Sequence, residues 1–282
     1  MQVSKALGLA TKLLKQSARD SPRLSSELLL AKVLGLERAY LLASDKRTLL
    51  PDEQKAFFAL VKRRFKGEPV AYLLGEKEFY GRPFQVNKSV LIPRPETELL
   101  IETVLREEES GELTFADLGT GSGILGLSLA LERPNWQGFL LDFSGEALKV
   151  ARNNLAAYKL GPRLQLLGGE FANLPFARQS LDFIVANPPY IAKSEIPLVS
   201  DEVLGYEPIS ALLADDQGLA AISAIIKSAA IVLKAGGKLY LEHGASQAQE
   251  VREILRTLPY QKVATGLDLA GRERVSWVKL KS

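Results

Sequence analysis

The stretch Phe115-Ala116-Asp117-Leu118-Gly119-Thr120-Gly121-Ser122-Gly123 joins a short apolar segment to a helical one, and it decides the fold. An apolar run that ends in closely spaced glycines and continues as a helix is typical of the first strand–loop–helix unit of a nucleotide-binding α/β domain. Glycines are needed there because side chains would hold a ligand away from the backbone amides at the helix N-terminus. Residues 121–126 also fit the G-x-G-x-x-G fingerprint of nicotinamide enzymes, so the loop alone leaves two cofactor classes open.

Two aspartates near this loop help to choose between those classes. Asp117 directly precedes the glycines, where a carboxylate suits a cofactor with a cationic amino-acid end and would repel a pyrophosphate. Asp142 ends the next predicted strand, where a carboxylate can accept hydrogen bonds from both ribose hydroxyls of either cofactor. The loop and Asp117 together therefore predict S-adenosylmethionine and not a nicotinamide.

The tetrapeptide Asn187-Pro188-Pro189-Tyr190 follows a strand predicted for residues 182–186 and supplies the candidate acceptor site. Strands one and four of a doubly wound sheet can flank the switch point where ligands bind, so the tetrapeptide is expected beside the glycine loop. The Asn187 side-chain oxygen and a backbone carbonyl, that of Pro188, can accept from both N–H groups of an amide or amine and aim its lone pair. The prolines stiffen this segment and remove its donors, and Tyr190 can stack on the planar acceptor group. This chemistry predicts N-methyl transfer.

Strand and helix patterns alternate after about residue 93. Helical stretches separate all but the last two predicted strands, which we expect to form an antiparallel hairpin. The predicted strands span residues 114–118, 138–142, 163–167, 181–186, 238–242, 262–267 and 275–279. The predicted helices between them span residues 123–132, 145–159, 218–233 and 247–258. The alternation predicts an α/β fold with a mainly parallel, doubly wound sheet.

The first part of the chain has a different character. Apolar residues recur at helical spacing through residues 1–75, and Ser21-Pro22 and Leu50-Pro51 are typical helix starts, so we expect a small helical bundle. The segment 78–86 predicts a β-hairpin whose turn is Gly81-Arg82-Pro83.

Composition narrows the possible functions. The chain has 282 residues, of which 46% are hydrophobic and 24% charged, as in an ordinary globular protein. With no cysteine and one histidine, disulfides and cysteine nucleophiles are excluded and no metal site is expected. There is no run of about 18 apolar residues, so we expect no membrane span and a cytoplasmic location. Residues 1–80 hold 15 Lys+Arg against 9 Asp+Glu, whereas the remaining residues hold 21 against 24. The basic side chains of residues 1–80 therefore either bind an acidic partner or form a solvated helix face.

The glycine loop and the tetrapeptide together resemble the motifs of the peptide-chain release factor glutamine N5-methyltransferases, the PrmC/HemK family. Further stretches resemble that family over nearly the whole chain, and combined they are more specific than the tetrapeptide, which adenine-N6 DNA methyltransferases also carry. These stretches are Gly67–Gly75, Phe79–Gly81, Ile92–Glu98, Tyr206–Pro208 and Asp268–Arg274.

The resemblance implies a domain organisation and a reaction. The α/β fold would be a Rossmann-like, seven-stranded class I methyltransferase domain at residues 93–282. An N-terminal helical substrate-recognition domain would span residues 1–75, and a hairpin linker residues 76–92. S-adenosylmethionine would be the methyl donor and leave as S-adenosylhomocysteine. The acceptor would be the glutamine of the Gly-Gly-Gln motif in class I release factors, which are thus the expected partners.

Residue chemistry and resemblance together assign the site. The predicted cofactor-binding residues are Asp117, Gly119, Thr120, Gly121, Ser122, Gly123, Asp142, Glu170, Phe171 and Asn187. The predicted substrate-binding residues are Asn187, Pro188, Pro189 and Tyr190, with Asn187, Pro188 and Tyr190 as catalytic candidates. The sequence departs from the family in one place. Members often carry an acidic and then a bulky apolar residue after the third strand, whereas this chain has Gly168-Gly169-Glu170-Phe171, so either of the last two is expected to line the adenine pocket.

Three other functions were weighed. An adenine-N6 DNA methyltransferase should carry a basic face over its site, and the slightly acidic balance of residues 81–282 argues against it, so we expect no direct nucleic-acid binding. A glutamine methyltransferase acting on a ribosomal protein would share the chemistry and stays open. A nicotinamide oxidoreductase would need a hydride-site acid, and Asp117 speaks against it.

Overall fold

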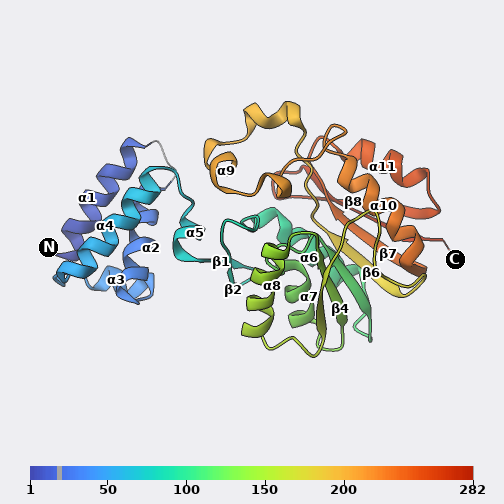
Figure 1. Cartoon of the computed structure of the whole chain (residues 1–282), viewed down its shortest axis with the longest axis horizontal. Coiled ribbons are helices and arrows are strands. Elements are labelled where there is room, and N and C mark those ends of the chain that lie inside the picture. Colours follow the sequence, from blue (N-terminus) through green and yellow to red (C-terminus); the bar gives the residue numbers. More distant parts are fainter. Residues whose placement is uncertain (18–20, 282) are drawn as a thin grey trace. The chain divides into compact units, whose positions relative to one another are not determined.

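The computed structural model describes residues 1–17 and 21–281, and they form two compact units (Figure 1). Unit 1 comprises Met1–Lys77 together with Ser200–Tyr206, and unit 2 comprises Glu78–Val199 and Glu207–Ser282. The chain therefore leaves unit 2 after residue 199 and returns to it at residue 207. This excursion was not predicted from the sequence.

Unit 1 is helical, in agreement with the periodicity of its apolar residues. Its core consists of aliphatic side chains and Phe57. Along each longer helix these buried side chains recur every three to four residues, so that they lie on one face. The helices are α1 (Val3–Gln16), α2 (Pro22–Leu34), α3 (Arg38–Ala43), α4 (Pro51–Phe65), α5 (Val70–Leu74) and α9 (Asp201–Tyr206). Both proline-containing start signals are confirmed, since Pro22 and Pro51 begin α2 and α4.

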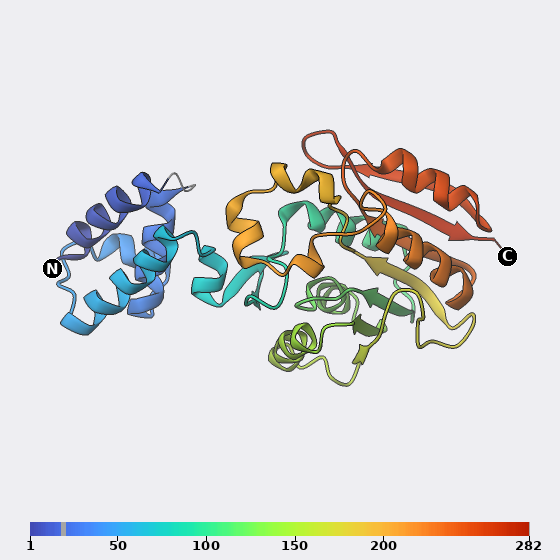
Figure 2. The ribbon, with the colours of Figure 1, turned by 45° about the horizontal axis from the view of Figure 1, so that its top comes forward.

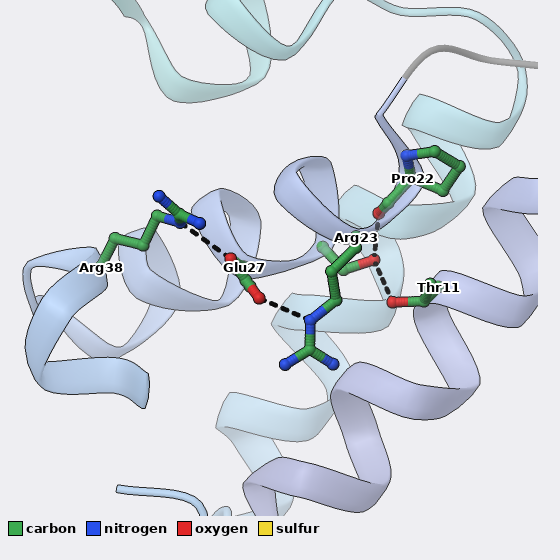
Figure 3. Close-up of polar contacts among 6 residues, drawn as sticks. Thr11, Pro22, Arg23, Glu27 and Arg38 are labelled. Carbon is green, nitrogen blue, oxygen red and sulfur yellow. Dashed lines mark hydrogen bonds and ion pairs between the residues drawn. The ribbon is translucent and has the colours of Figure 1, made fainter. Parts of the chain in front are cut away.

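A buried carboxylate holds two of these helices together (Figure 3). Glu27 of α2 is almost fully buried, and it forms ion pairs with Arg23 of the same helix and with Arg38, the first residue of α3. Burial alone would raise the pKa of Glu27, but hydrogen bonds from Arg38 and Arg23 lower it below its usual value. The carboxylate therefore stays ionised and fixes the α2–α3 corner.

Unit 2 is built on a seven-stranded sheet in the order β5-β4-β3-β6-β7-β9-β8, which confirms the α/β class and the number of strands. Strands β3 to β7 run parallel, and β9 is antiparallel to both β7 and β8, so the expected terminal hairpin is also present. The strands are β3 (Thr114–Leu118), β4 (Gln137–Asp142), β5 (Leu164–Gly168), β6 (Leu181–Ala186), β7 (Leu233–Glu242), β8 (Tyr260–Leu267) and β9 (Glu273–Leu280).

Helices cover both faces of this sheet (Figure 2). Helices α6, α7 and α8 share one core with Phe115 and Leu140, and helices α10 and α11 share a second core with Ala116 and Leu118. Neighbouring residues of β3 thus point into different cores, which explains why the central strands are apolar apart from Asp117 and Asp182. The helices are α6 (Glu98–Glu107), α7 (Ile124–Glu132), α8 (Gly145–Ala157), α10 (Ala220–Val232) and α11 (Ala248–Arg256), with 3₁₀ turns η1 (Pro95–Thr97), η2 (Lys193–Leu198) and η3 (Ile209–Ala211).

The hairpin predicted near residue 80 exists, but its turn was wrongly assigned. Strands β1 (Glu76–Phe79) and β2 (Arg82–Gln85) are joined by Tyr80 and Gly81, which both have positive φ. Two adjacent residues with positive φ make the tight turn that suits a two-residue hairpin, so Arg82 and Pro83 belong to the strand. Phe79 and Phe84 are buried in the core shared with α6, α7 and α8. Within residues 1–17 and 21–281, the helices are all too short or too polar to traverse a bilayer.

Candidate active site

A cavity of about 240 Å³ lies in unit 2, at the carboxyl ends of the parallel strands. A water molecule takes up about 30 Å³ in the liquid, so the space suits a small-molecule ligand and not single waters. The predicted site residues in its wall are Gly119, Thr120, Gly121, Ser122, Asp142, Phe171, Asn187 and Pro189. The other predicted residues, namely Asp117, Gly123, Glu170, Pro188 and Tyr190, do not line it.

Sheet register explains why the two motifs meet at this cavity. Strands β3 and β6 are adjacent and parallel, and Leu118 pairs with Ala186 at their ends. The next residues along the chain are Gly119 and Asn187, so both loops leave the same edge of the sheet. Pairing thus brings together segments about 65 residues apart, as the switch-point argument predicts.

The glycine loop is held in a fixed conformation by the strand beside it. The amides of Gly119 and Thr120 both donate to the Leu141 carbonyl, at 2.8 and 3.0 Å, and Gly119, Gly121 and Gly123 all have positive φ. Gly126 of α7 has no such conformational need. A Cβ atom there would come within 2.2 Å of a Leu140 side-chain carbon, so its glycine allows close helix–sheet packing.

Asp117 lies beneath this loop and is fully buried. Its Oδ2 atom accepts hydrogen bonds from the Thr120 hydroxyl at 2.6 Å and the Gly126 amide at 3.0 Å. Its Oδ1 atom has no hydrogen-bond partner within the described residues. Burial raises the pKa of Asp117 to about 7, although these two bonds act in the opposite direction. The carboxylate thus braces the loop, and one oxygen remains free to accept.

Asp142 places a second carboxylate directly in the cavity wall. Its Oδ2 atom accepts from the Gly121 amide and its Oδ1 atom from the Ser144 amide, both at 2.9 Å. Burial raises the pKa of Asp142, while hydrogen bonds from backbone amides lower it. Each carboxylate oxygen can accept a second hydrogen bond, so two ribose hydroxyls can be held here.

The tetrapeptide contributes Asn187 and Pro189 to the wall. The Asn187 Nδ2 atom donates to the Thr97 hydroxyl at 3.1 Å, and Thr97 also lines the cavity. Pro188 is buried behind this surface. The polar atom that Asn187 can offer to a ligand is therefore its Oδ1 acceptor.

Tyr190 does not line the cavity and packs against the core that includes α10 and α11. Burial raises the pKa of its phenol to about 12. Its carbonyl accepts a hydrogen bond from Gln247 Nε2 at 2.9 Å. Gly218, with a φ of +85°, fits against that carbonyl, and an added Cβ would lie 2.1 Å from it. These contacts fix where the tetrapeptide ends.

The residues after β5 are divided between surface and cavity. Phe171 lines the cavity, and its ring carbon Cζ lies 3.1 Å from an ideal Cβ on Gly119. Glu170 is exposed. Of the two candidates for an adenine pocket, Phe171 is thus the one in the wall.

Several residues of the wall were not among the predicted site residues. Some directly follow predicted ones, at the starts of α7 and α8, namely Ile124, Leu125, Phe143, Ser144, Glu146 and Ala147. The others lie in two separate segments. They precede α6 and follow α9, and the buried carboxylate of Glu207 joins them by accepting from the Ile92 amide at 3.0 Å and from Arg94 Nη2 at 2.6 Å. Part of each segment, residues 92–98 and residues 206–208, belongs to a stretch that carries the family resemblance. Their cavity-lining residues are Ser89, Val90, Leu91, Pro93, Arg94, Thr97, Pro208, Ser210 and Ala211.

The residues of the wall fit S-adenosylmethionine. The carboxylate of Asp142 suits ribose hydroxyls, and the aromatic ring of Phe171 suits adenine. Asp117 is not part of the wall and holds the glycine loop from beneath. The loop adjoining Asp117 carries glycines where Cβ atoms would otherwise narrow the space. The sulfonium of the cofactor supplies the methyl group when bound.

Comparison with known proteins finds family models and relatives that match most of the chain. A model described as "PrmC N-terminal domain" matches residues 5–75, and one described as "Methyltransferase small domain" matches residues 95–205. The release factor glutamine methyltransferase of Nitratidesulfovibrio vulgaris is 42% identical, with 90% of this chain and 87% of that protein covered. That of Vibrio cholerae is 40% identical, with 99% and 97% covered.

The fold comparison points in the same direction. The crystal structure of a ribosomal protein L11 methylase from Lactobacillus delbrueckii subsp. bulgaricus has a TM-score of 0.51 at 18% identity, with 70% of this chain and 84% of that chain covered. At that identity the likeness establishes the fold alone. The sequence identities and coverages establish more. The chain is an S-adenosylmethionine-dependent methyltransferase and belongs to the family of release factor glutamine methyltransferases.

Proposed function

We propose that this chain transfers the methyl group of S-adenosylmethionine to the side-chain amide nitrogen, N5, of the glutamine in the Gly-Gly-Gln motif of class I release factors. The observation that carries the proposal is that Asn187 shares one cavity wall with Asp142 and the glycine loop. A side-chain oxygen that can accept a hydrogen bond from a substrate amide thus lies beside the residues that would bind the cofactor. The names of the relatives supply the acceptor protein.

The cofactor half of the site follows from its donors and acceptors. Asp142 accepts from the ribose hydroxyls, Phe171 packs against the adenine, and residues 119–123 follow the cofactor backbone. Asp117 receives the cationic amino-acid end through its free oxygen or, if that end lies further out, acts only by bracing the loop. Glu170 is not needed for this arrangement because it lies on the surface.

The acceptor half rests on the chemistry of an amide. Its nitrogen is a poor nucleophile because the lone pair is delocalised into the carbonyl. Acceptance of both N–H groups, by Asn187 Oδ1 and by the Pro188 carbonyl, favours a pyramidal nitrogen and points its lone pair at the methyl group. Such alignment accounts for up to about 7–11 kcal/mol of barrier reduction. Pro189 and Tyr190 keep this backbone rigid, and the nitrogen loses its proton after transfer.

The rest of the chain is assigned in the same terms. Residues 1–75 form the substrate-recognition domain, residues 76–92 a hairpin linker, and residues 93–282 the methyltransferase domain. The basic balance of residues 1–80 suits an acidic face of the release factor. We propose a cytoplasmic enzyme with no direct nucleic-acid partner, since its substrate is a protein of translation.

The test is a transfer assay with methyl-labelled S-adenosylmethionine and three acceptors offered in parallel. These are a purified class I release factor, the same factor with its Gly-Gly-Gln glutamine replaced by alanine, and a mixture of ribosomal proteins. We expect label on the first alone. Label on the alanine variant or on a ribosomal protein would overturn the proposed acceptor.

Asn187→Ala tests the role of the tetrapeptide. We expect it to abolish transfer to the release factor while the dissociation constant for S-adenosylmethionine changes less than about threefold, since Asn187 contributes to alignment. Titration calorimetry measures binding separately from turnover. Turnover that persists with weakened cofactor binding would assign Asn187 to the cofactor alone.

A further inference from the structure

A buried carboxylate stands behind the acceptor site, and the proposed chemistry does not use it. Glu242 is the last residue of β7, which pairs with β6, the strand that leads into Asn187. Its side chain is 1% exposed and does not line the cavity. Its Oε2 atom has no hydrogen-bond partner within the described residues. A buried charge with so few partners is costly, so its retention calls for a function.

Glu242 is linked to the acceptor site through two side chains. The Nδ2 atom of Asn187 donates to Thr97 Oγ1 at 3.1 Å. Strand pairing of Ala186 with Leu241 brings Glu242 next to Asn187, and the side chains of Thr97 and, to a smaller extent, Asn187 lower the pKa of its carboxyl. One N–H group of Asn187 therefore has its acceptor in Thr97, and the Glu242 carboxylate is the nearby acceptor for the other. The Oδ1 atom is the part of this carboxamide that remains for the cavity.

We propose that Glu242 is a positioning residue that, with Thr97, selects the orientation of the Asn187 carboxamide that presents Oδ1 to the acceptor amide. The inference rests on the proposed function, because it concerns how Asn187 grips that amide. Turning the carboxamide over would present N–H groups to the substrate and leave no acceptor for its amide hydrogens. The turned-over carboxamide is thus incompatible with methyl transfer. An asparagine side chain does not by itself favour one of its two orientations, so neighbouring groups must select it.

A carboxylate is suited to this selection because it only accepts hydrogen bonds when ionised. When protonated, it can instead donate to Oδ1 and stabilise the turned-over carboxamide. The charged and titratable groups around Glu242 are Glu96 in η1, Arg274 of β9 and Tyr190 after β6. Burial raises the pKa of Glu242 to about 7, with hydrogen bonds from Thr97 and the charge of Arg274 opposing the rise. Transfer is therefore expected to fall as the pH drops through about 7.

The central experiment compares wild type with Glu242→Gln in steady-state transfer to release factor between pH 6 and pH 9. Glutamine has the same shape but can accept or donate, so it no longer selects one orientation. We expect kcat at pH 8.5 to fall about 10- to 100-fold, with the dissociation constant for S-adenosylmethionine unchanged within twofold. We also expect the variant to lose the step in its rate profile near pH 7. Wild-type kcat and an unchanged profile would overturn the proposal.

Glu108→Gln is the matched control. Glu108 is also a largely buried carboxylate with a raised pKa, and it accepts a hydrogen bond at 2.8 Å from Tyr240 on the same strand as Glu242. It lies outside the cavity wall. We expect its replacement to leave kcat and the pH profile unchanged. An equal effect of both substitutions would overturn the specific role of Glu242.

Thr97 gives a second route that keeps Glu242 in place. Thr97→Val removes the hydroxyl while keeping the shape, and we expect it to lower kcat, whereas Thr97→Ser keeps the hydroxyl and should restore most of it. Failure of serine to differ from valine would contradict the proposal.

Thermal stability separates positioning from mere bracing. Burial raises the pKa of Glu242 from 4.5 to about 7, so wild type loses stability as the pH rises through this range, and the loss is complete above it. Glutamine does not titrate, so Glu242→Gln should gain in melting temperature relative to wild type between about pH 5 and pH 7 and gain no more up to pH 8.5. A brace would instead lose stability and activity together at every pH, and that result would overturn the proposal.

A readout without acceptor distinguishes failure of this inference from failure of the proposed function. The side-chain amide signals of Asn187, identified by their absence in Asn187→Ala, should shift in ¹⁵N–¹H spectra as the pH passes about 7 in wild type and stay constant in Glu242→Gln. If release factor is labelled but the Asn187 signals show the same pH dependence in wild type and in Glu242→Gln, the positioning role fails and the proposed function stands. If release factor is not labelled but the signals respond, the acceptor is wrong and the positioning role stands.

Discussion

At the scale of single residues, the site depends on carboxylates whose first task is to hold backbone. Asp117 and Asp142 both follow the pattern of an acid at or near the end of a parallel strand that accepts hydrogen bonds from loop amides. The same groups keep acceptor capacity that a ligand can use. We propose that such a side chain both shapes the loop and binds the cofactor, so that a substitution affects both.

Asp142→Ala should weaken S-adenosylmethionine binding by about 1.5–3 kcal/mol for each charge-assisted bond lost, or about 10- to 150-fold per bond. Titration calorimetry gives the value. Asp182→Ala is the control, since Asp182 also accepts from a backbone amide, that of Thr114, but lies at the opposite end of the sheet. Equal affinity in wild type and Asp142→Ala would refute the ribose assignment.

At the scale of elements, the acceptor site is fixed by what lies behind it. The loop before α10 and the first turn of α11 meet at the Tyr190 carbonyl, which accepts from Gln247 and sits against Gly218. Gly218 therefore fills a position where both its positive φ and its lack of a side chain are needed.

Gly218→Ala should displace Tyr190 and with it the tetrapeptide. Because the new Cβ would overlap the carbonyl, and alanine is strained at this φ, we expect a loss of at least about 1–3 kcal/mol in stability and a lower kcat. Thermal unfolding and the transfer assay measure the two effects. Gly161→Ala, where nothing lies within 4 Å and φ is not positive, should change neither. Full activity in Gly218→Ala would show that the close contact between Gly218 and the Tyr190 carbonyl is not needed for transfer.

Elements with a strong local pattern could be predicted from the sequence. The strands at residues 114–118 and 181–186 were predicted with their observed ends, because an apolar run there stops at glycine or proline. Asn187 and Asp142 could be found because each follows or ends such a strand. Glu242 also ends a predicted strand, but its burial and its position next to Thr97 and Asn187 depend on residues more than 50 positions away, so the local pattern does not reveal its role.

At the scale of the whole molecule, unit 1 is made from two stretches of the chain that lie far apart in sequence. Helix α9 completes it through Glu202, which pairs at 2.7 Å with the buried Arg64 of α4, and through Tyr206, whose hydroxyl donates to the Lys66 carbonyl. Nothing in the local pattern of residues 200–206 distinguishes a helix of one unit from a helix of the other. This explains why the sequence did not predict the excursion.

Glu202→Gln should destabilise unit 1 by about 1–3 kcal/mol, a value between those of exposed and fully buried ion pairs, because Arg64 is left buried without its partner. Hydrogen exchange of the α4 amides reports on this unit and should become about 5- to 150-fold faster. Asp215→Asn, which removes an exposed ion pair with Lys193, should leave these rates unchanged. Unaltered exchange in Glu202→Gln would mean that α9 adds nothing to the unit.

The same excursion limits how such enzymes can exchange parts during evolution. A single genetic crossover near residue 77 would replace α1 to α5 but leave the resident α9, so that Arg64 or its substitute would face a Glu202 inherited from the other parent. Where the two parents differ at these positions, a recombinant keeps the ion pair only if it inherits both stretches from the same parent. Exchange of unit 1 between such parents therefore requires two exchanged segments, residues 1–77 and 200–206.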